Sequence, residues 1–220
     1  MTNIVFAFIL LLFLFFLGSL YISKLDFRTN KIWINAFNTA IKLCRNNETI
    51  AKAFRFAKND STILDEDSHF IAAAQKEFGA DYIEWLTDDL SVADIPCAVF
   101  KTLMHGYRYM AYIDHKEMSD ASEPLRAFNE ILPANGFESL PDDIIETDIK
   151  TINAIEDVST RTSNIIKQLD QYADQQGGKI LWLNENSDSY AFFVMFPTIY
   201  MQLRNTRLDD NHHFEMLPSI

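Results

Sequence analysis

Two groups of polar residues each stand next to a segment with strong β-strand propensity. Asp114 and Lys116 follow the aromatic run Tyr107–Ile113. Asp188 and Tyr190 stand where a second β-prone run begins. If the two strands are neighbours in one sheet, these four side chains approach one another at its end, where loops on a rigid scaffold tend to hold binding residues. The alternative is that they form turns and a surface ion pair, which contributes little.

A pair of histidines near the C-terminus could hold a metal ion with nearby carboxylates, because imidazole and carboxylate are common zinc ligands. His212 and His213 lie in the stretch DDNHHFE, which also contains Asp209 and Glu215. However, adjacent histidines seldom converge on one ion, and this segment is polar. The sequence therefore favours a solvated tail here, and we predict no metal ligand and no cofactor.

Motifs of the known catalytic classes do not occur in the sequence. There is no Walker loop, no GxGxxG, no HExxH, no GxSxG and no CxxC. The chain has only six glycines, which argues against a phosphate-cradling loop, and its two cysteines exclude a four-cysteine zinc site. We predict no catalytic residue, so a binding protein is favoured over an enzyme.

Charge is segregated along the 220 residues, which carry a formal net charge of −12. Residues 24–58 hold eight basic and two acidic side chains, whereas residues 60–157 hold six basic and 22 acidic ones. So many acids cannot all be paired, and burying unpaired carboxylates is too costly, so they face water or a basic partner. We predict a basic protein partner, with Glu84, Asp88 and Asp89 among the binding residues, and no nucleic acid. The alternative is that these acids serve solubility only.

The N-terminal region contains 19 consecutive uncharged residues, from Ile4 to Ile22. As a helix this stretch spans about 28 Å, close to the ~30 Å hydrocarbon core of a bilayer. We predict a single uncleaved transmembrane helix; a cleaved signal peptide and a buried core helix are the alternatives. Basic residues follow the stretch rather than precede it, so the positive-inside rule places the rest of the chain in the cytoplasm rather than the periplasm.

The remaining elements predict an α+β fold with a small antiparallel sheet covered by helices on one face. The run 107–113 is expected to pair with a hairpin formed by residues 179–183 and 190–196. Along the chain we expect a transmembrane anchor (1–23), a basic helical neck (24–60), an acidic α+β domain (61–205) and a polar tail (206–220).

Two motifs carry a resemblance to a known family. They are GYRYMAYIDHKE, from Gly106 to Glu117, and ILWLNENSDSYAFFVMFP, from Ile180 to Pro197. Over roughly residues 65–205 the chain resembles an uncharacterised bacterial family, a domain of unknown function, in which these two motifs recur. The resemblance implies an α+β fold and a bacterial source, and it implies no activity.

Taken together, these features favour a membrane-tethered acidic binding module of the bacterial inner membrane. One form is an immunity-type protein that neutralises a toxin. The alternatives are an envelope scaffold or maintenance subunit, and a membrane-bound hydrolase with a site near Asp114 and Asp188. The sequence does not set the oligomeric state.

The anchor makes a direct prediction about membrane topology. Because residues 4–22 are expected to span the bilayer, the full-length protein should stay in the membrane pellet during alkaline carbonate extraction. A reporter that is active only in the cytoplasm should be active when fused after residue 58. A shortened protein released into the supernatant would contradict the uncleaved anchor, and activity of a periplasmic reporter alone would contradict the orientation.

Overall fold

The computed structural model describes residues 29–60, 62–63, 68–79, 86, 91–114, 116–185 and 189–216. Within them an antiparallel sheet has the strand order β1-β3-β2-β4. The strands are β1 (Ala111–Asp114), β2 (Lys179–Asn184), β3 (Ser189–Met195) and β4 (His213–Met216). The helices labelled in the structure are α2 (Glu48–Asn59), α3 (His69–Phe78), α5 (Ile95–Gly106), η2 (Glu117–Ser119), α6 (Ser122–Ile131), α7 (Asp142–Asn153), α8 (Val158–Gln175) and α9 (Pro197–Leu203). Residues 29–43 form a further helix before α2.

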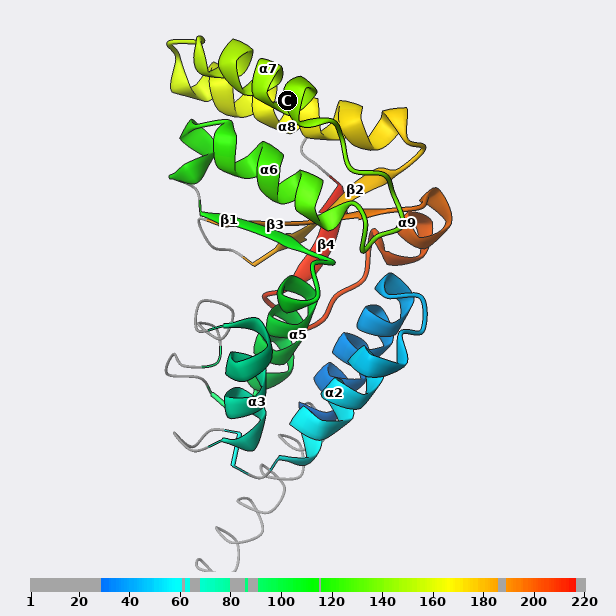
Figure 1. Cartoon of the computed structure of the whole chain (residues 1–220). Coiled ribbons are helices and arrows are strands. Elements are labelled where there is room, and N and C mark those ends of the chain that lie inside the picture. Colours follow the sequence, from blue (N-terminus) through cyan, green and yellow to red (C-terminus); the bar gives the residue numbers. More distant parts are fainter. Residues whose placement is uncertain are drawn as a thin grey trace, which may run out of the picture.

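Helices cover both faces of the sheet (Figure 1). Side chains of a strand alternate between the faces, so Phe193 points into a core shared with α2, α5 and the helix of residues 29–43. Phe192 and Val194 point the other way, into a core shared with α6, α7 and α8. The expected α+β fold with a small antiparallel sheet is therefore confirmed, but the expectation that helices cover only one face was wrong.

The predicted hairpin is present, and β1 pairs with it as expected; the strand that it contacts is the second one, β3. Ala111 lies opposite Phe192, and Trp182 lies opposite Phe192 on the other side. The first strand is shorter than the run 107–113 predicted, because the chain leaves α5 through a turn. The N–H groups of Tyr107 and Tyr109 donate to carbonyls of the last turn of α5, and Arg108 has a φ of 60°. These residues cap the helix instead of joining the sheet.

The segment expected to form a basic helical neck contains two helices, the helix of residues 29–43 and α2. Asn47 caps α2, since its side chain accepts a hydrogen bond from the N–H of Thr49. The helix of residues 29–43 packs into the same core as α5 and β3. Among the described residues, no helix is both long and apolar enough to cross a membrane. The predicted anchor, residues 4–22, lies outside the described residues.

Arg45, in the turn between the helix of residues 29–43 and α2, contacts the loop that follows α6 on the other side of the sheet. The Arg45 guanidinium donates a hydrogen bond of 2.6 Å to the carbonyl of Asn135 and lies 4.5 Å above the ring of Phe196. Next to it, Gly136 has a φ of 82°, and a Cβ there would lie 2.6 Å from the same guanidinium. Glycine at this position therefore suits both the backbone conformation and the close approach of Arg45.

The fourth strand, β4, lies in the segment for which the sequence indicates only a polar tail, residues 206–220. Within this segment Leu208 and Phe214 are buried. The Phe214 ring packs edge-on against Phe193 and Phe100, with centroid distances of 5.4 and 6.3 Å. Leu208 and Phe214 thus attach this segment to the core, although most of its other residues are polar.

Replacing Phe214 by alanine should therefore destabilise the protein. We expect a loss of about 3–5 kcal/mol in the free energy of unfolding, because a buried aromatic ring is removed. The measurement is urea unfolding of the full chain followed by tryptophan fluorescence. Met216→Ala is the matched control on the same strand, since Met216 is 60% exposed and should change stability by less than about 0.5 kcal/mol. Equal effects of the two changes would contradict the burial of β4.

Candidate functional site

The structure brings together the ends of the two strands that the sequence singled out. Asp114 lies opposite Ser189, and the neighbouring pair is Ile113 and Tyr190. The carboxylate of Asp114 accepts a hydrogen bond of 2.8 Å from the N–H of Lys116, which is the geometry of a turn entering η2. Turn formation therefore accounts for the side chain of Asp114.

Two other predicted residues of this region, Tyr190 and Lys116, are among the described residues. The ring of Tyr190 packs against Trp182 at a centroid distance of 4.5 Å. Lys116 is exposed. Asp188 lies outside the described residues, as do the predicted binding acids Glu84, Asp88 and Asp89.

Acidic residues gather in the helical layer formed by α6, α7 and α8. Residues 116–178, which make up this layer with its loops, contain 13 acidic and five basic side chains. Residues 29–60, on the other side of the sheet, contain six basic and two acidic ones. Figure 1 shows the two groups at opposite ends of the molecule, with the sheet between them. The charge segregation seen along the sequence is therefore also a segregation in space.

A groove of about 490 Å³ runs between α6 and α7 within this acidic layer. Its lining residues are Arg126, Asn129, Glu130, Asp142, Ile145 and Glu146. Arg126 and Glu146 form an ion pair of 2.6 Å across the groove. Three acids against one base leave the lining with a net negative charge, and we call this surface the α6–α7 groove.

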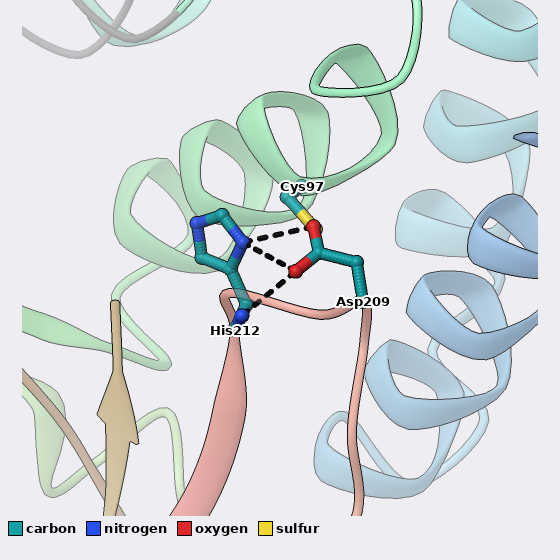
Figure 2. Close-up of side chains that lie close together, drawn as sticks. All are labelled: Cys97, Asp209 and His212. Carbon is teal, nitrogen blue, oxygen red and sulfur yellow. Dashed lines mark hydrogen bonds and ion pairs between the residues drawn. The ribbon is translucent and has the colours of Figure 1, made fainter. Parts of the chain in front are cut away.

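A second feature is a largely buried group of three side chains, Cys97, Asp209 and His212, which we call the Cys97 cluster (Figure 2). Cys97 lies in the first turn of α5, directly after Pro96, and is 1% exposed. Asp209 and His212 lie in the turn that leads into β4. Long-range folding thus joins residues separated by 112 positions in the chain.

Asp209 is the centre of this cluster. Its carboxylate accepts hydrogen bonds of 2.7 Å from the backbone N–H groups of Asn211 and His212. The Cys97 thiol donates to it at 2.9 Å, and Nδ1 of His212 lies 2.9 Å from both of its oxygens. Because an ionised carboxylate only accepts hydrogen bonds, this arrangement requires the proton of a neutral His212 ring to be on Nδ1.

Burial shapes the acid–base behaviour of the cluster. It raises the pKa of the Cys97 thiol well above the usual range, and the neighbouring Asp209 carboxylate raises it further. Burial also opposes ionisation of Asp209, but hydrogen bonds from His212 and Cys97 outweigh this effect and hold the pKa of Asp209 well below its usual range. The cluster therefore contains a thiol and a carboxylate anion.

A buried ion pair lies beside the cluster. Lys101, one helical turn after Cys97 on α5, contacts Glu185 at 2.9 Å, and the two side chains are 11% and 5% exposed. The second oxygen of Glu185, Oε1, has no hydrogen-bond partner among the described residues. α5 is buried along most of its length, so a lysine on it needs such a counter-ion.

The geometry distinguishes between two kinds of chemistry for this cluster. A nucleophilic cysteine needs a lowered thiol pKa, an adjacent base and access for a substrate. Here the thiol donates to Asp209 rather than to the imidazole, its pKa is raised, and it is almost inaccessible. A thiol, a carboxylate and an imidazole that converge are instead a ligand set that a transition metal ion accepts.

From the sequence, His212 and Asp209 were candidates for metal binding, but the polar character of the segment favoured a solvated tail. The structure places both in a largely buried turn, with side chains 14% and 9% exposed. The contributions of Cys97, Lys101 and Glu185 were missed, because the three come from α5 and the end of β2. The one available signal was a lysine within a mostly apolar helical segment, 95–104.

Comparison with known proteins gives a family. A family model described as a domain of unknown function, DUF6630, matches residues 48–198. The chain belongs to this family. The DUF6630 match confirms the resemblance found in the sequence and extends closer to the N-terminus. No curated protein and no solved structure matches the chain. The DUF6630 segment contains Cys97, Lys101 and Glu185, whereas Asp209 and His212 lie beyond it.

The burial of both cysteines predicts slow thiol chemistry. In the native full chain, treated with a chelator, neither Cys44 nor Cys97 should react appreciably with Ellman's reagent near neutral pH, because burial raises both thiol pKa values. Both should react once the protein is unfolded in guanidinium. Rapid modification of Cys97 in the folded protein would contradict this arrangement and favour a nucleophilic role.

Proposed function

We propose that this protein is a membrane-tethered binding module that engages a basic protein partner through the acidic layer formed by α6, α7 and α8. The observation that carries the proposal is the separation of charge across the sheet. The layer has eight more acidic than basic side chains among residues 116–178, while residues 29–60 have an excess of four basic ones. A surface of one sign speeds the approach of an oppositely charged partner and disfavours others.

The α6–α7 groove is the part of this layer best suited to receive a basic segment. Its concave shape can surround a lysine or arginine side chain, and Asp142 adds negative charge beyond the Arg126–Glu146 pair. Glu130 is exposed and is paired with Arg108 at 3.1 Å, a surface ion pair that a basic partner can compete with. On the adjoining surface of α7, Ile144 is 44% exposed and offers apolar contact. Interfaces of this kind gain much of their affinity from a few desolvated contacts surrounded by polar ones.

The proposed tether is the apolar stretch 4–22, with the domain on the cytoplasmic side of the bacterial inner membrane. Basic residues directly after the stretch support this orientation. A tether raises the local concentration of the domain at the membrane and so favours encounters with a partner there. An immunity-type role, in which the partner is a toxin, fits the acidic layer, and an envelope scaffold role is the second candidate because the apolar stretch offers a surface for other membrane helices.

Charge reversal in the groove tests the proposal. Partners are recovered from membranes with the full chain as bait, and binding of each purified partner is then measured with the variant Glu130→Lys/Asp142→Lys/Glu146→Lys. We expect a basic partner whose association rate falls about 10-fold or more with this variant and falls steeply with salt.

The matched control changes the same total charge outside the groove, with Glu138→Lys/Glu156→Lys/Asp170→Lys. All three control residues are exposed. Equal loss with both variants would mean a general effect of net charge, and no loss with either would refute the acidic layer as the binding surface. Loss of binding on changes within residues 4–22 alone would favour the scaffold role.

Further variants separate the remaining alternatives. Glu84→Lys/Asp88→Lys/Asp89→Lys tests whether the acids predicted from the sequence also bind. Asp114→Asn and Asp188→Asn should each have little effect. If one of these single changes abolished function while the groove variant was silent, the hydrolase alternative at the sheet end would replace the binding proposal.

A further inference from the structure

We propose that the Cys97 cluster is a binding site for a divalent transition metal ion of the zinc type. The three candidate ligand atoms, one each from Cys97, Asp209 and His212, all lie within 4.8 Å of one another. This is the spacing expected of groups that can share one ion with small side-chain movements, because zinc lies about 2.0–2.3 Å from each of its ligands.

The chemistry of the donors selects the class of metal. A thiolate, an imidazole and a carboxylate together suit zinc and its neighbours in the transition series, whereas calcium and magnesium require oxygen ligands. With the thiol deprotonated, Cys97 and Asp209 supply two negative charges that match a divalent ion. Three protein ligands also leave the fourth tetrahedral position open to water or to another ligand.

The cluster has the supports that ordered metal sites use. Backbone N–H groups of Asn211 and His212 fix the carboxylate of Asp209. α5 positions Cys97, and packing of Leu208 and Phe214 into the core holds the turn that carries the other two ligands. Close by, Glu185 keeps one buried carboxylate oxygen without a hydrogen-bond partner among the described residues. Such outer carboxylates typically orient ligands or metal-bound water.

Metal binding has a defined proton balance. The ion replaces the thiol hydrogen of Cys97, which leaves to solvent as a proton, and a Cys97 sulfur–metal bond forms. The imidazole proton of His212 moves from Nδ1 to Nε2, so that Nδ1 can bind the ion. One proton is therefore released per ion, and no oxidant or reductant is needed.

Cobalt(II) titration of the purified full chain, stripped with a chelator, tests this site. Cobalt reports its ligands by colour, because a bound thiolate produces a sulfur-to-cobalt charge-transfer band in the near ultraviolet. We expect this band to saturate at one ion per chain and to disappear when zinc is added in excess. Cys97→Ser should abolish the band, and His212→Asn and Asp209→Asn should each weaken zinc affinity by at least about 100-fold, as loss of a direct ligand exceeds the 10- to 100-fold cost of an outer one.

Cys44→Ser is the matched control, because Cys44 is also buried but its thiol contacts Met104 instead of the cluster. This variant should keep the full cobalt band and the full thermal shift produced by zinc. Circular dichroism verifies that each variant is folded, and Cys97→Ala serves if Cys97→Ser is not. Absence of a charge-transfer band in the folded wild type, an unchanged band in the folded Cys97 variant, or unchanged zinc affinity in both folded His212→Asn and Asp209→Asn would each overturn the proposal.

Discussion

Strand β3 is buried on both faces, and the rest of the structure follows from this constraint. Residues 191–195 are all buried, so neither face of the strand can be left to water. The helices α6, α7 and α8 cover one face, and α2, α5 and the helix of residues 29–43 cover the other. Removing either layer would expose a row of large apolar side chains, each of which contributes roughly 1.5–3 kcal/mol when buried. The two oppositely charged helical layers therefore lie on opposite sides of β3, because each layer packs against one of its faces.

Much of the fold could be predicted because local signals agreed with the final structure. The β2–β3 hairpin has a short-range pattern, because two β-prone runs flank a short polar stretch. The strand β1 was recognised from its own β-prone run, although its partner β3 is distant in the sequence. The unbroken run AFFVM in β3 was the sign that both faces are buried, since a half-exposed strand would alternate with polar residues. In the aromatic run 107–113, local propensity and structure disagree. Its first residues have β propensity, but their backbone N–H groups bond to the end of α5, so the strand begins only at Ala111.

The Cys97 cluster illustrates why a site can be invisible along a sequence. Cys97 is separated from Asp209 by 112 residues, and only the pairing of β4 with β2 brings the turn of Asp209 and His212 against α5. β4 has a single buried apolar side chain, Phe214, and its other residues are partly or fully exposed, so its four residues did not suggest a strand. The sequence suggested the adjacent His212 and His213 as a pair of ligands, whereas only His212 belongs to the cluster.

In the part of the chain that the structure describes, the two outermost strands of the sheet, β1 and β4, are four residues long. An outer strand exposes unpaired backbone groups on which another chain can extend the sheet, and long, flat outer strands are the sites where aggregation begins. Here each outer strand offers very few such groups, and it carries charged or polar side chains such as Asp114 and Glu215. The longer strands β2 and β3, which contain most of the apolar sequence, each have strand neighbours on both sides. This placement leaves little free backbone on the described part of the sheet for the sheet of another copy to extend.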